Sequence, residues 1–260
     1  MGEKLSTEQP PLEPLKVPSK KRASIHKSSP SKIKIKVGKG KDMDMHKICL
    51  NGYELQNFLA GGTFGAVYKS CSPDGDCNYV VKIQDLNDSD RKVEWETEVE
   101  TTKLLDSYNI GSKFIGAWFC DEDKIGFIVS ELWSGSLAPE GEIAPCLPTK
   151  LIDKLMKEIK TINELKLVHG DILPKNVLVK KDYRGNIIDA TVTDFGSVQS
   201  IKQWKKDQDS FGWINTMYRY HLDDPNLRSF YKDGGIRLQD IIADPKLLDK
   251  PLIYYLRNCV

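Results

Sequence analysis

Two short polar segments in the middle of the chain hold the side chains best suited to acid–base and metal chemistry. Asp171 and Asn176 are five residues apart in the segment His169–Asn176, and Asp194 opens the tripeptide Asp194-Phe195-Gly196. A carboxylate such as Asp171 can accept or orient the proton of a hydroxyl nucleophile. Oxygen donors such as those of Asn176 and Asp194 are the ligands that Mg²⁺ prefers. Asp, Asn and Gly are also common in turns, which is the structural alternative for these positions.

A glycine-rich segment nearer the N-terminus offers a second kind of site. It runs through Leu59, Ala60, Gly61, Gly62, Thr63, Phe64, Gly65, Ala66 and Val67. Glycines in a turn between two strands let backbone N–H groups approach phosphate oxygens, because no Cβ stands in the way. On its own this pattern has a commoner explanation, which is an ordinary glycine hairpin.

Lys82 lies in the apolar run Tyr79–Ile83, which follows the glycine-rich segment. A lysine inside an apolar strand is costly to bury unless an anion accompanies it. The phosphates of ATP and a carboxylate on a neighbouring helix would supply that anion, whereas a lysine on the solvent face of the strand would need neither. The order of these features, from the glycine-rich segment through Lys82 and Asp171 to Asp194, favours transfer of a phosphoryl group from ATP.

The residues that would position this chemistry fall into a strand-rich half and a helix-rich half, which indicates an α+β fold. Segments rich in Val, Ile and aromatic residues, separated by Gly and Asp clusters, predict antiparallel strands. They lie at 53–59, 65–70, 78–84, 114–120 and 125–131, and two further strands are expected at 177–180 and 190–193.

Two helices are expected. The charged run 91–105 is unbroken by Gly or Pro. Leu151, Leu155, Ile159 and Ile162 recur on one face of a second segment, 149–166, which predicts an amphipathic helix.

The first 48 residues differ in composition from the rest. They hold 12 Lys and Arg against 5 Asp and Glu and no aromatic residue, whereas residues 49–260 hold 26 basic and 32 acidic residues. Such a segment buries too little apolar surface to offset its ordering entropy, so we expect a disordered basic tail over 1–48 and a folded domain over 49–260. Contact of Lys20-Lys21-Arg22 with nucleic acid is the less favoured interpretation. The alternating residues 32–37 could form a short edge strand.

The six cysteines are scattered through the chain: Cys49, Cys71, Cys77, Cys120, Cys146 and Cys259. No two have the C-x-x-C spacing, which in a chain of 260 residues favours reduced thiols inside a cell. No apolar run reaches the ~18 residues of a membrane span, and the N-terminus lacks the apolar core of a signal peptide. We therefore expect an intracellular protein, cytoplasmic or nuclear, with no membrane partner.

Over roughly residues 53–218 the chain resembles the eukaryotic-type protein kinase superfamily. The resemblance is carried by the four features described above. It implies a two-lobed fold, with an antiparallel-sheet N-lobe over about 49–132 and a truncated helical C-lobe over about 133–260. The segments Ser130–Trp133 and Asp207–Gly212 are most similar to the casein kinase one and vaccinia-related kinase branch.

The resemblance assigns a nucleotide site. The segment Leu59–Val67 would cover the phosphates of ATP, and Lys82 would bind the α- and β-phosphates. Glu98 would pair with Lys82 from the first helix, since Glu98–Leu105 follows the helix pattern of the family better than the other glutamates do. The backbones of Glu131 and Trp133 would hold adenine.

The resemblance also assigns the catalytic residues. Asp171 would be the catalytic base, assisted by Lys82, and Asn176 and Asp194 would hold Mg²⁺. Asp207 would brace the catalytic loop through its backbone N–H groups. ATP and Mg²⁺ are therefore the expected cofactors.

Four departures from the family pattern bear on function. Ala60 replaces a glycine, and Gly170 replaces the arginine that usually precedes the base. Leu173 stands where a lysine usually contacts the γ-phosphate, and Lys175 is the expected substitute. Only residues 197–206 separate Asp-Phe-Gly from the Asp207 segment, so the usual activation loop and peptide shelf are missing. This compactness resembles small kinases of large DNA viruses.

These observations favour a serine/threonine protein kinase that uses MgATP and acts on a protein substrate, with a regulatory protein partner left open. The absent γ-phosphate lysine keeps a pseudokinase or scaffold as an alternative. The His-Gly-Asp sequence keeps a small-molecule phosphotransferase as another.

Overall fold

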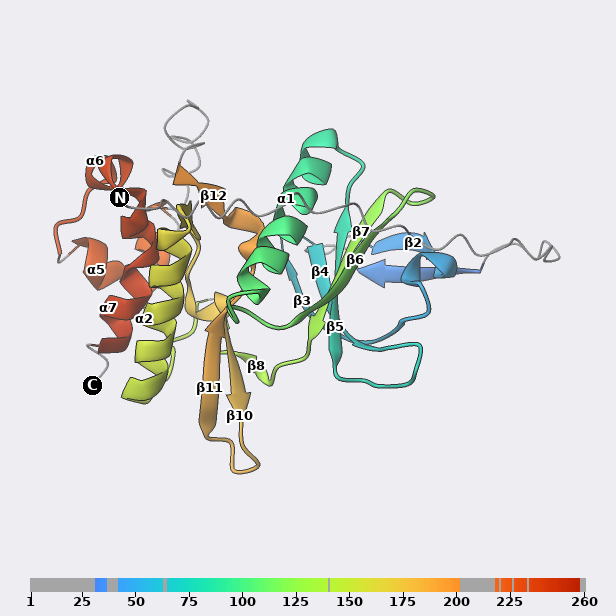
Figure 1. Ribbon diagram of the computed structural model, residues 1–260, viewed down its shortest axis with the longest axis horizontal. Coiled ribbons are helices and arrows are strands. Elements are labelled where there is room, and N and C mark those ends of the chain that lie inside the picture. The colour runs from blue at the N-terminus through green and yellow to red at the C-terminus, as the bar shows by residue number, and fades with distance from the viewer. Residues whose placement is uncertain are drawn as a thin grey trace, which may run out of the picture. The chain divides into compact units, whose positions relative to one another are not determined.

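The structure is a computed structural model that describes residues 31–36, 42–62, 65–139, 141–201, 218–219, 221–225, 227–232 and 234–257. All of these belong to the second of two units of the chain, Ser31–Val260. Strands gather in one half of this unit and helices in the other, so the α+β class is confirmed (Figure 1).

Five strands form one antiparallel sheet, in the order β3-β4-β5-β7-β6. They are β3 (Glu54–Gly62), β4 (Gly65–Cys71), β5 (Tyr79–Asp85), β6 (Phe114–Cys120) and β7 (Ile125–Glu131). All five predicted strands are confirmed with small shifts at their ends. Because side chains alternate along a strand, Val81 and Ile83 face one side of the sheet and Lys82 the other. Val81 and Ile83 are fully buried.

Helix α1 (Ser89–Asp106) covers the face of the sheet to which Lys82 points (Figure 1). The Asp88 carboxylate caps its first turn by accepting the Asp90 N–H, a contact that commonly begins helices. Trp95 and Val99 pack with Ile128 of β7 in a small apolar cluster. This packing fixes which side of α1 faces the sheet.

The opposite face of the sheet is covered by a hairpin of β1 (Lys32–Lys36) and β2 (Asp42–His46), followed by the short helix η1 (Lys47–Leu50). Ile35 and Met45 are buried against the sheet, and the Lys36 N–H donates to the Tyr68 hydroxyl at 2.6 Å. The expectation of disorder throughout 1–48 is therefore wrong for these strands. Alternate apolar residues give the hairpin one buried face, although its overall composition is polar. Residues 1–30 lie outside the described part.

The second half is built on α2 (Thr149–Glu164), whose predicted apolar face is buried. Glu158 interrupts that face, and its carboxylate accepts the Val192 N–H at 3.1 Å and the Thr191 hydroxyl at 3.0 Å. The strands of this half are β8 (Gly135–Ser136), β9 (Leu167–Val168), β10 (Val177–Lys181), β11 (Ile187–Val192) and β12 (Gln199–Ser200). Its other helices are η2 (Pro174–Asn176), η3 (Phe195–Ser197), α5 (Arg228–Lys232), α6 (Leu238–Ala243), η4 (Pro245–Asp249) and α7 (Pro251–Arg257).

The cysteines differ from expectation. Cys49 is joined to Cys120, and Cys71 to Cys77, by disulfides, and Cys146 is also disulfide-bonded. Cys49 and Cys120 are 71 residues apart in sequence, so spacing alone could not reveal their pairing. The prediction of reduced thiols is wrong for these five residues. Disulfides persist in oxidising surroundings, so cysteine usage no longer supports a reducing compartment.

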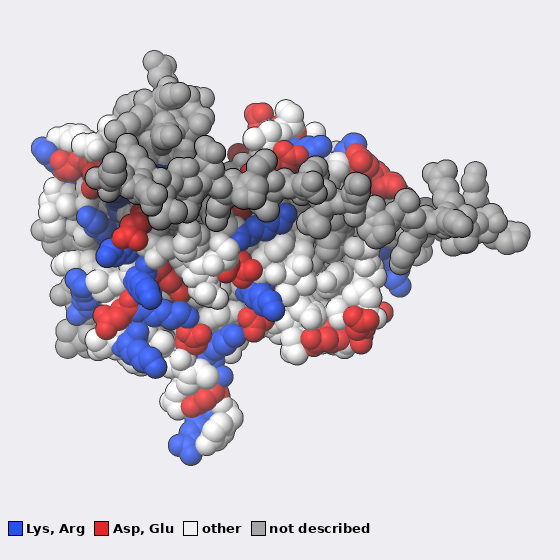
Figure 2. Space-filling view, viewed as in Figure 1, with Lys and Arg blue, Asp and Glu red and all other residues white. Residues whose placement is uncertain are grey.

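Both signs of charge occur together on the described surface. Figure 2 shows Lys and Arg beside Asp and Glu over α2 and over the β10–β11 hairpin. Lys154 Nζ lies 2.6 Å from Asp189 Oδ1, and Lys180 Nζ lies 3.0 Å from Glu131 Oε1. None of the described helices is both long and apolar enough to span a membrane.

Candidate functional site

Lys82 joins the two halves of the described unit. Its ammonium lies 2.6 Å from Glu98 Oε1 and 2.8 Å from Asp194 Oδ1. The Gln84 side chain donates to the second oxygen of Glu98 at 2.8 Å. The structure thus brings together a strand, a helix and the Asp-Phe-Gly segment at one point.

The charges at this point are unbalanced. Burial works to lower the pKa of Lys82, but Asp194 and Glu98 outweigh it and raise the pKa of the ammonium. Burial raises the pKa of Glu98, against the opposing effect of Lys82. Burial also works to raise the pKa of Asp194, but Lys82 lowers the pKa more. One ammonium between two carboxylates leaves a net negative charge, which suits a divalent cation.

Glu98 differs from the neighbouring glutamates in its burial. Glu94, Glu96 and Glu100 are exposed on α1, whereas Glu98 is 5% exposed. A buried carboxylate needs a cationic or hydrogen-bonding partner, and Lys82 and Gln84 supply both. The structure therefore places the predicted glutamate, and not the other three, against Lys82.

Asp171, in the loop between β9 and η2, lies beside Asn176, the last residue of η2. The Asn176 amide donates at 2.9 Å to Asp171 Oδ2 and at 2.9 Å to the Asp171 carbonyl. These bonds use the nitrogen of the amide and leave its oxygen facing elsewhere, where it could serve as a metal ligand. Asp171 Oδ1 is buried and accepts no hydrogen bond from the described residues.

Thr193 ties Asp194 to this loop. Its N–H donates to the Asn176 carbonyl at 2.9 Å. Its carbonyl lies 3.0 Å from His169 Nε2, and His169 Nδ1 lies 3.4 Å from the Asp171 N–H. The His169 ring thus contacts the backbone of both segments through its two nitrogens. Asp171, Asn176 and the residue before Asp194 therefore share one hydrogen-bonded frame.

Gly170 has a structural reason to replace the usual arginine. Its φ is +80°, in the left-handed region that side-chain-bearing residues adopt with strain. Its N–H donates to Asp249 Oδ1 at 2.8 Å, and the His169 N–H donates to Asp249 Oδ2 at 3.0 Å. The Asn163 amide donates to the same Oδ2 at 3.0 Å. Asp249, which is fully buried, thus holds the loop in the way expected of Asp207, which lies outside the described residues.

Leu173 packs in the apolar core, whereas Lys175 lies near Asp171. Leu173 is 1% exposed and belongs to the apolar core, so it cannot supply a phosphate contact. Lys175 Nζ lies 4.0 Å from Asp171 Oδ2. The cation that could replace the missing lysine is therefore on the same side of the loop as the carboxylate of Asp171.

The glycine-rich segment forms the turn between β3 and β4, where Ala60 pairs with Val67 and Gly62 with Gly65. Gly65 has φ +130°, and a Cβ there would lie 2.2 Å from the Ile83 carbonyl oxygen. Strand packing alone therefore requires glycine at this position. Thr63 and Phe64 lie outside the described residues.

The segment expected to hold adenine follows β7. The Glu131 N–H donates to the Lys113 carbonyl at 3.0 Å. The Trp133 backbone N–H makes no hydrogen bond with any residue that the structure describes. The centroid of the Trp133 ring lies 4.6 Å from the ammonium of Lys180, which is a cation–π contact.

Sequence reasoning missed two residues of this site. Asp249 contacts the loop that carries Asp171 although it lies 80 residues from His169 in sequence, and the only sign of its burial in the sequence was its position next to Leu247 and Leu248. His221 is fully buried, with Nδ1 2.8 Å from the Tyr231 hydroxyl and Nε2 3.8 Å from Asp171 Oδ1. No sequence pattern around His221 pointed to Asp171.

Comparisons with known proteins show which family the chain resembles in sequence. A family model for the protein kinase domain matches residues 53–218. Serine/threonine-protein kinase GG21441 of Drosophila erecta is 27% identical over 152 residues, which cover 56% of this chain and 20% of the relative. MAP kinase kinase kinase SSK2 of Saccharomyces cerevisiae is 27% identical over 159 residues, covering 57% and 10%. Calcium-dependent protein kinase 4 of Plasmodium falciparum is 24% identical over 168 residues, covering 62% and 31%.

The chain thus aligns with less than a third of the length of each of these relatives. The match of the family model is longer than half of the chain and contains every residue of the frame described above except Asp249 and His221. The chain therefore belongs to the protein kinase family.

Proposed function

We propose that the protein is an ATP-dependent serine/threonine protein kinase with a two-lobed fold. The observation that carries this proposal is the double pairing of Lys82, with Glu98 at 2.6 Å and with Asp194 at 2.8 Å. A lysine held between two carboxylates, of which Glu98 is buried and Asp194 about one-third exposed, is costly as a purely structural device. It suits a site where phosphate and metal charges complete the balance.

The residues divide the work of phosphoryl transfer. Lys82 would bind the α- and β-phosphates, with Glu98 fixing its position, and Leu59–Val67 would cover the phosphates. The backbones of Glu131 and Trp133 would hold adenine. Asn176 and Asp194 are oxygen donors suited to Mg²⁺, which would neutralise charge on the phosphates.

Asp171 would act on the substrate hydroxyl. As the hydroxyl oxygen bonds to the γ-phosphorus, the bond from that phosphorus to the β–γ bridging oxygen breaks, and the hydroxyl proton passes to the Asp171 carboxylate. Lys175 would stabilise the charge on the transferred group, because its ammonium lies 4.0 Å from Asp171 Oδ2.

A radiolabelled ATP assay tests the proposal. Wild-type protein, Asp171→Asn and Asp194→Asn would be compared on a protein mixture and on a panel of aminoglycosides, choline and sugars. Asp153→Asn is the matched control, because Asp153 is exposed on α2. We expect label on proteins, lost in the two site variants only. Label on a small molecule instead would assign a small-molecule phosphotransferase.

The runner-up is a pseudokinase, favoured by the burial of Leu173 where a phosphate-binding lysine is usual. It predicts nucleotide binding without any turnover that depends on Lys82. A place in the casein kinase one and vaccinia-related kinase branch, and a cytoplasmic or nuclear location, stay predictions.

A further inference from the structure

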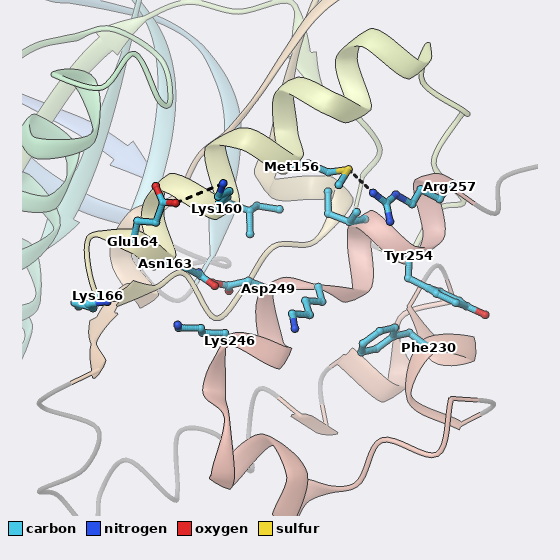
Figure 3. Close-up of a pocket in the computed structure, with 13 residues that line it drawn as sticks. Met156, Lys160, Asn163, Glu164, Lys166, Phe230, Lys246, Asp249, Tyr254 and Arg257 are labelled. Carbon is cyan, nitrogen blue, oxygen red and sulfur yellow. Dashed lines mark hydrogen bonds and ion pairs between the residues drawn. The ribbon is translucent and has the colours of Figure 1, made fainter.

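A cavity of about 810 Å³ lies between the C-terminal half of α2, η4 and α7. This volume is in the range of ligand sites. Its walls do not include Lys82, Asp171, Asn176 or Asp194, so it is separate from the proposed nucleotide site. Figure 3 shows its lining side chains.

The lining is strongly basic. It contains five cations, Lys160, Lys166, Lys246, Lys250 and Arg257, and two carboxylates, Glu164 and Asp249. Glu164 Oε1 lies 3.6 Å from Lys160 Nζ, and the Asp249 carboxylate accepts hydrogen bonds from N–H groups of the catalytic loop. Within the part of the chain that the structure describes, Lys166, Lys246 and Lys250 have no ion-pair partner. The cavity therefore presents positive charge that an anionic ligand could neutralise.

The cavity also has an apolar side. Ile159 is buried in its wall, and Met156, Ile253, Phe230 and Tyr254 complete it. Burial of apolar side chains stabilises a complex, and nearby cations select for negative charge. A ligand that combines an apolar group with several carboxylates fits both parts of the lining.

The spread of the cations favours a chain over a small ion. Figure 3 places Lys166 and Lys246 at one end of the cavity and Arg257 with Tyr254 at the other. The wall from Met156 to Glu164 alone is about 12 Å of helix. A single phosphate reaches one end only, whereas an extended peptide covers about 3.3 Å per residue and reaches both.

The cavity is coupled to the catalytic loop through two of its walls. Asn163 and Asp249 both line it, and they are hydrogen-bonded to each other at 3.0 Å. Asp249 also accepts the N–H groups of His169 and Gly170, directly before Asp171. Asp249 is itself fully buried, so a ligand that restrains Asn163 would act on the loop through the hydrogen bond from Asn163 to Asp249.

We propose that this cavity binds an acidic segment of a protein partner that carries an apolar side chain, and that binding orders the catalytic loop. This goes beyond the proposed function. Binding of the peptide and ordering of the loop can both be measured without ATP, so they do not depend on the proposed kinase activity. Only the expectation that binding regulates activity rests on the proposed function.

The binding test uses the full chain and a short fluorescein-labelled peptide in which glutamates flank one phenylalanine. Fluorescence anisotropy at about 0.1 M salt, where charges still interact over about 10 Å, would measure its affinity. We expect binding, none with a glutamine version of the peptide, and affinity about tenfold weaker for Lys250→Glu and for Lys246→Glu. Lys157→Glu is the control, since Lys157 is an exposed lysine of α2 outside the cavity.

Three results would overturn the binding proposal: no binding, equal loss in Lys157→Glu, or displacement of the peptide by pyrophosphate at similar concentration, which would mark a small-anion site. Two lysine variants are tested separately so that misfolding of one does not decide the result, and thermal melts check that both are folded. For loop order, the amides of His169 and Gly170 should exchange with deuterium more slowly when the peptide is bound. Unchanged exchange with bound peptide would overturn the coupling.

Discussion

Asp249→Asn tests whether the loop that carries Asp171 is held from outside the kinase motifs. The substitution keeps the shape of the side chain and turns one oxygen into an NH₂ group. The least costly orientation puts that group at the Oδ1 position, 2.8 Å from the Gly170 N–H, and keeps an oxygen for the His169 N–H and the Asn163 amide. One buried N–H then loses its acceptor.

A buried donor without a partner costs about 1–3 kcal/mol. Burial raises the pKa of Asp249, although His169 and the bonded N–H groups oppose this, so the neutral amide escapes part of the desolvation penalty. We therefore expect a loss of about 1–2 kcal/mol in the free energy of unfolding, or about 2–8 °C in melting temperature. Because Gly170 precedes Asp171, we also expect kcat to fall by up to about 10²-fold and KM for ATP to stay unchanged.

Calorimetry, steady-state kinetics and amide exchange at His169 and Gly170 measure the three effects. Asp153→Asn, an exposed change of the same kind on α2, should alter none of them. An Asp249→Asn protein with wild-type melting, kcat and exchange would refute the idea that this carboxylate holds the loop. A change in KM for ATP with unchanged kcat would show that Asp249 acts on nucleotide binding and not on the loop that carries Asp171.

Three further predictions concern other parts of the fold. Burial raises the pKa of Glu158 to about 7 from 4.5; the folded state then binds this proton more tightly, so stability should fall by up to about 3 kcal/mol as pH rises from about 4.5 to about 7. In urea unfolding measured across this pH range, Glu158→Gln should remove most of the pH dependence of the free energy of unfolding. Replacing both Cys49 and Cys120 by Ala should lower the free energy of unfolding by about 4 kcal/mol, given the sequence separation of 71 residues that the disulfide closes, measured by urea unfolding without reductant so that the disulfides of Cys71, Cys77 and Cys146 stay intact. Lys175→Met should lower kcat about 10²-fold with unchanged nucleotide affinity by calorimetry; a wild-type kcat would remove Lys175 from the reaction.

The sheet and its two long helices could be predicted because their signals are local. β6 and β7 begin and end at the predicted residues, since runs of aromatic and β-branched side chains define them. The apolar spacing in α2 likewise marks its buried face. The Lys82–Glu98 pair could be predicted because both residues lie in recognisable family patterns.

The remaining features depend on contacts between distant segments. The alternation in residues 32–37 did indicate β1, but its pairing with β2 and its burial against the sheet were not predicted, because the composition of residues 1–48 averages over a segment in which alternate residues are buried. Asp249 and His221 reach the catalytic loop from elements with no kinase motif. The pairing of Cys49 with Cys120 likewise requires knowing that η1 lies beside β6.

The hairpin of β1 and β2 also determines where the chain can be shortened. A recombinant protein beginning at residue 49 would lose Ile35 and Met45, which are 4% and 0% exposed, and would uncover the sheet around Tyr68 and Phe127. An uncovered apolar face of this kind promotes aggregation. Expression from residue 31 onward keeps the cover, so insolubility of the shorter protein would reflect a misplaced boundary and not an unstable kinase.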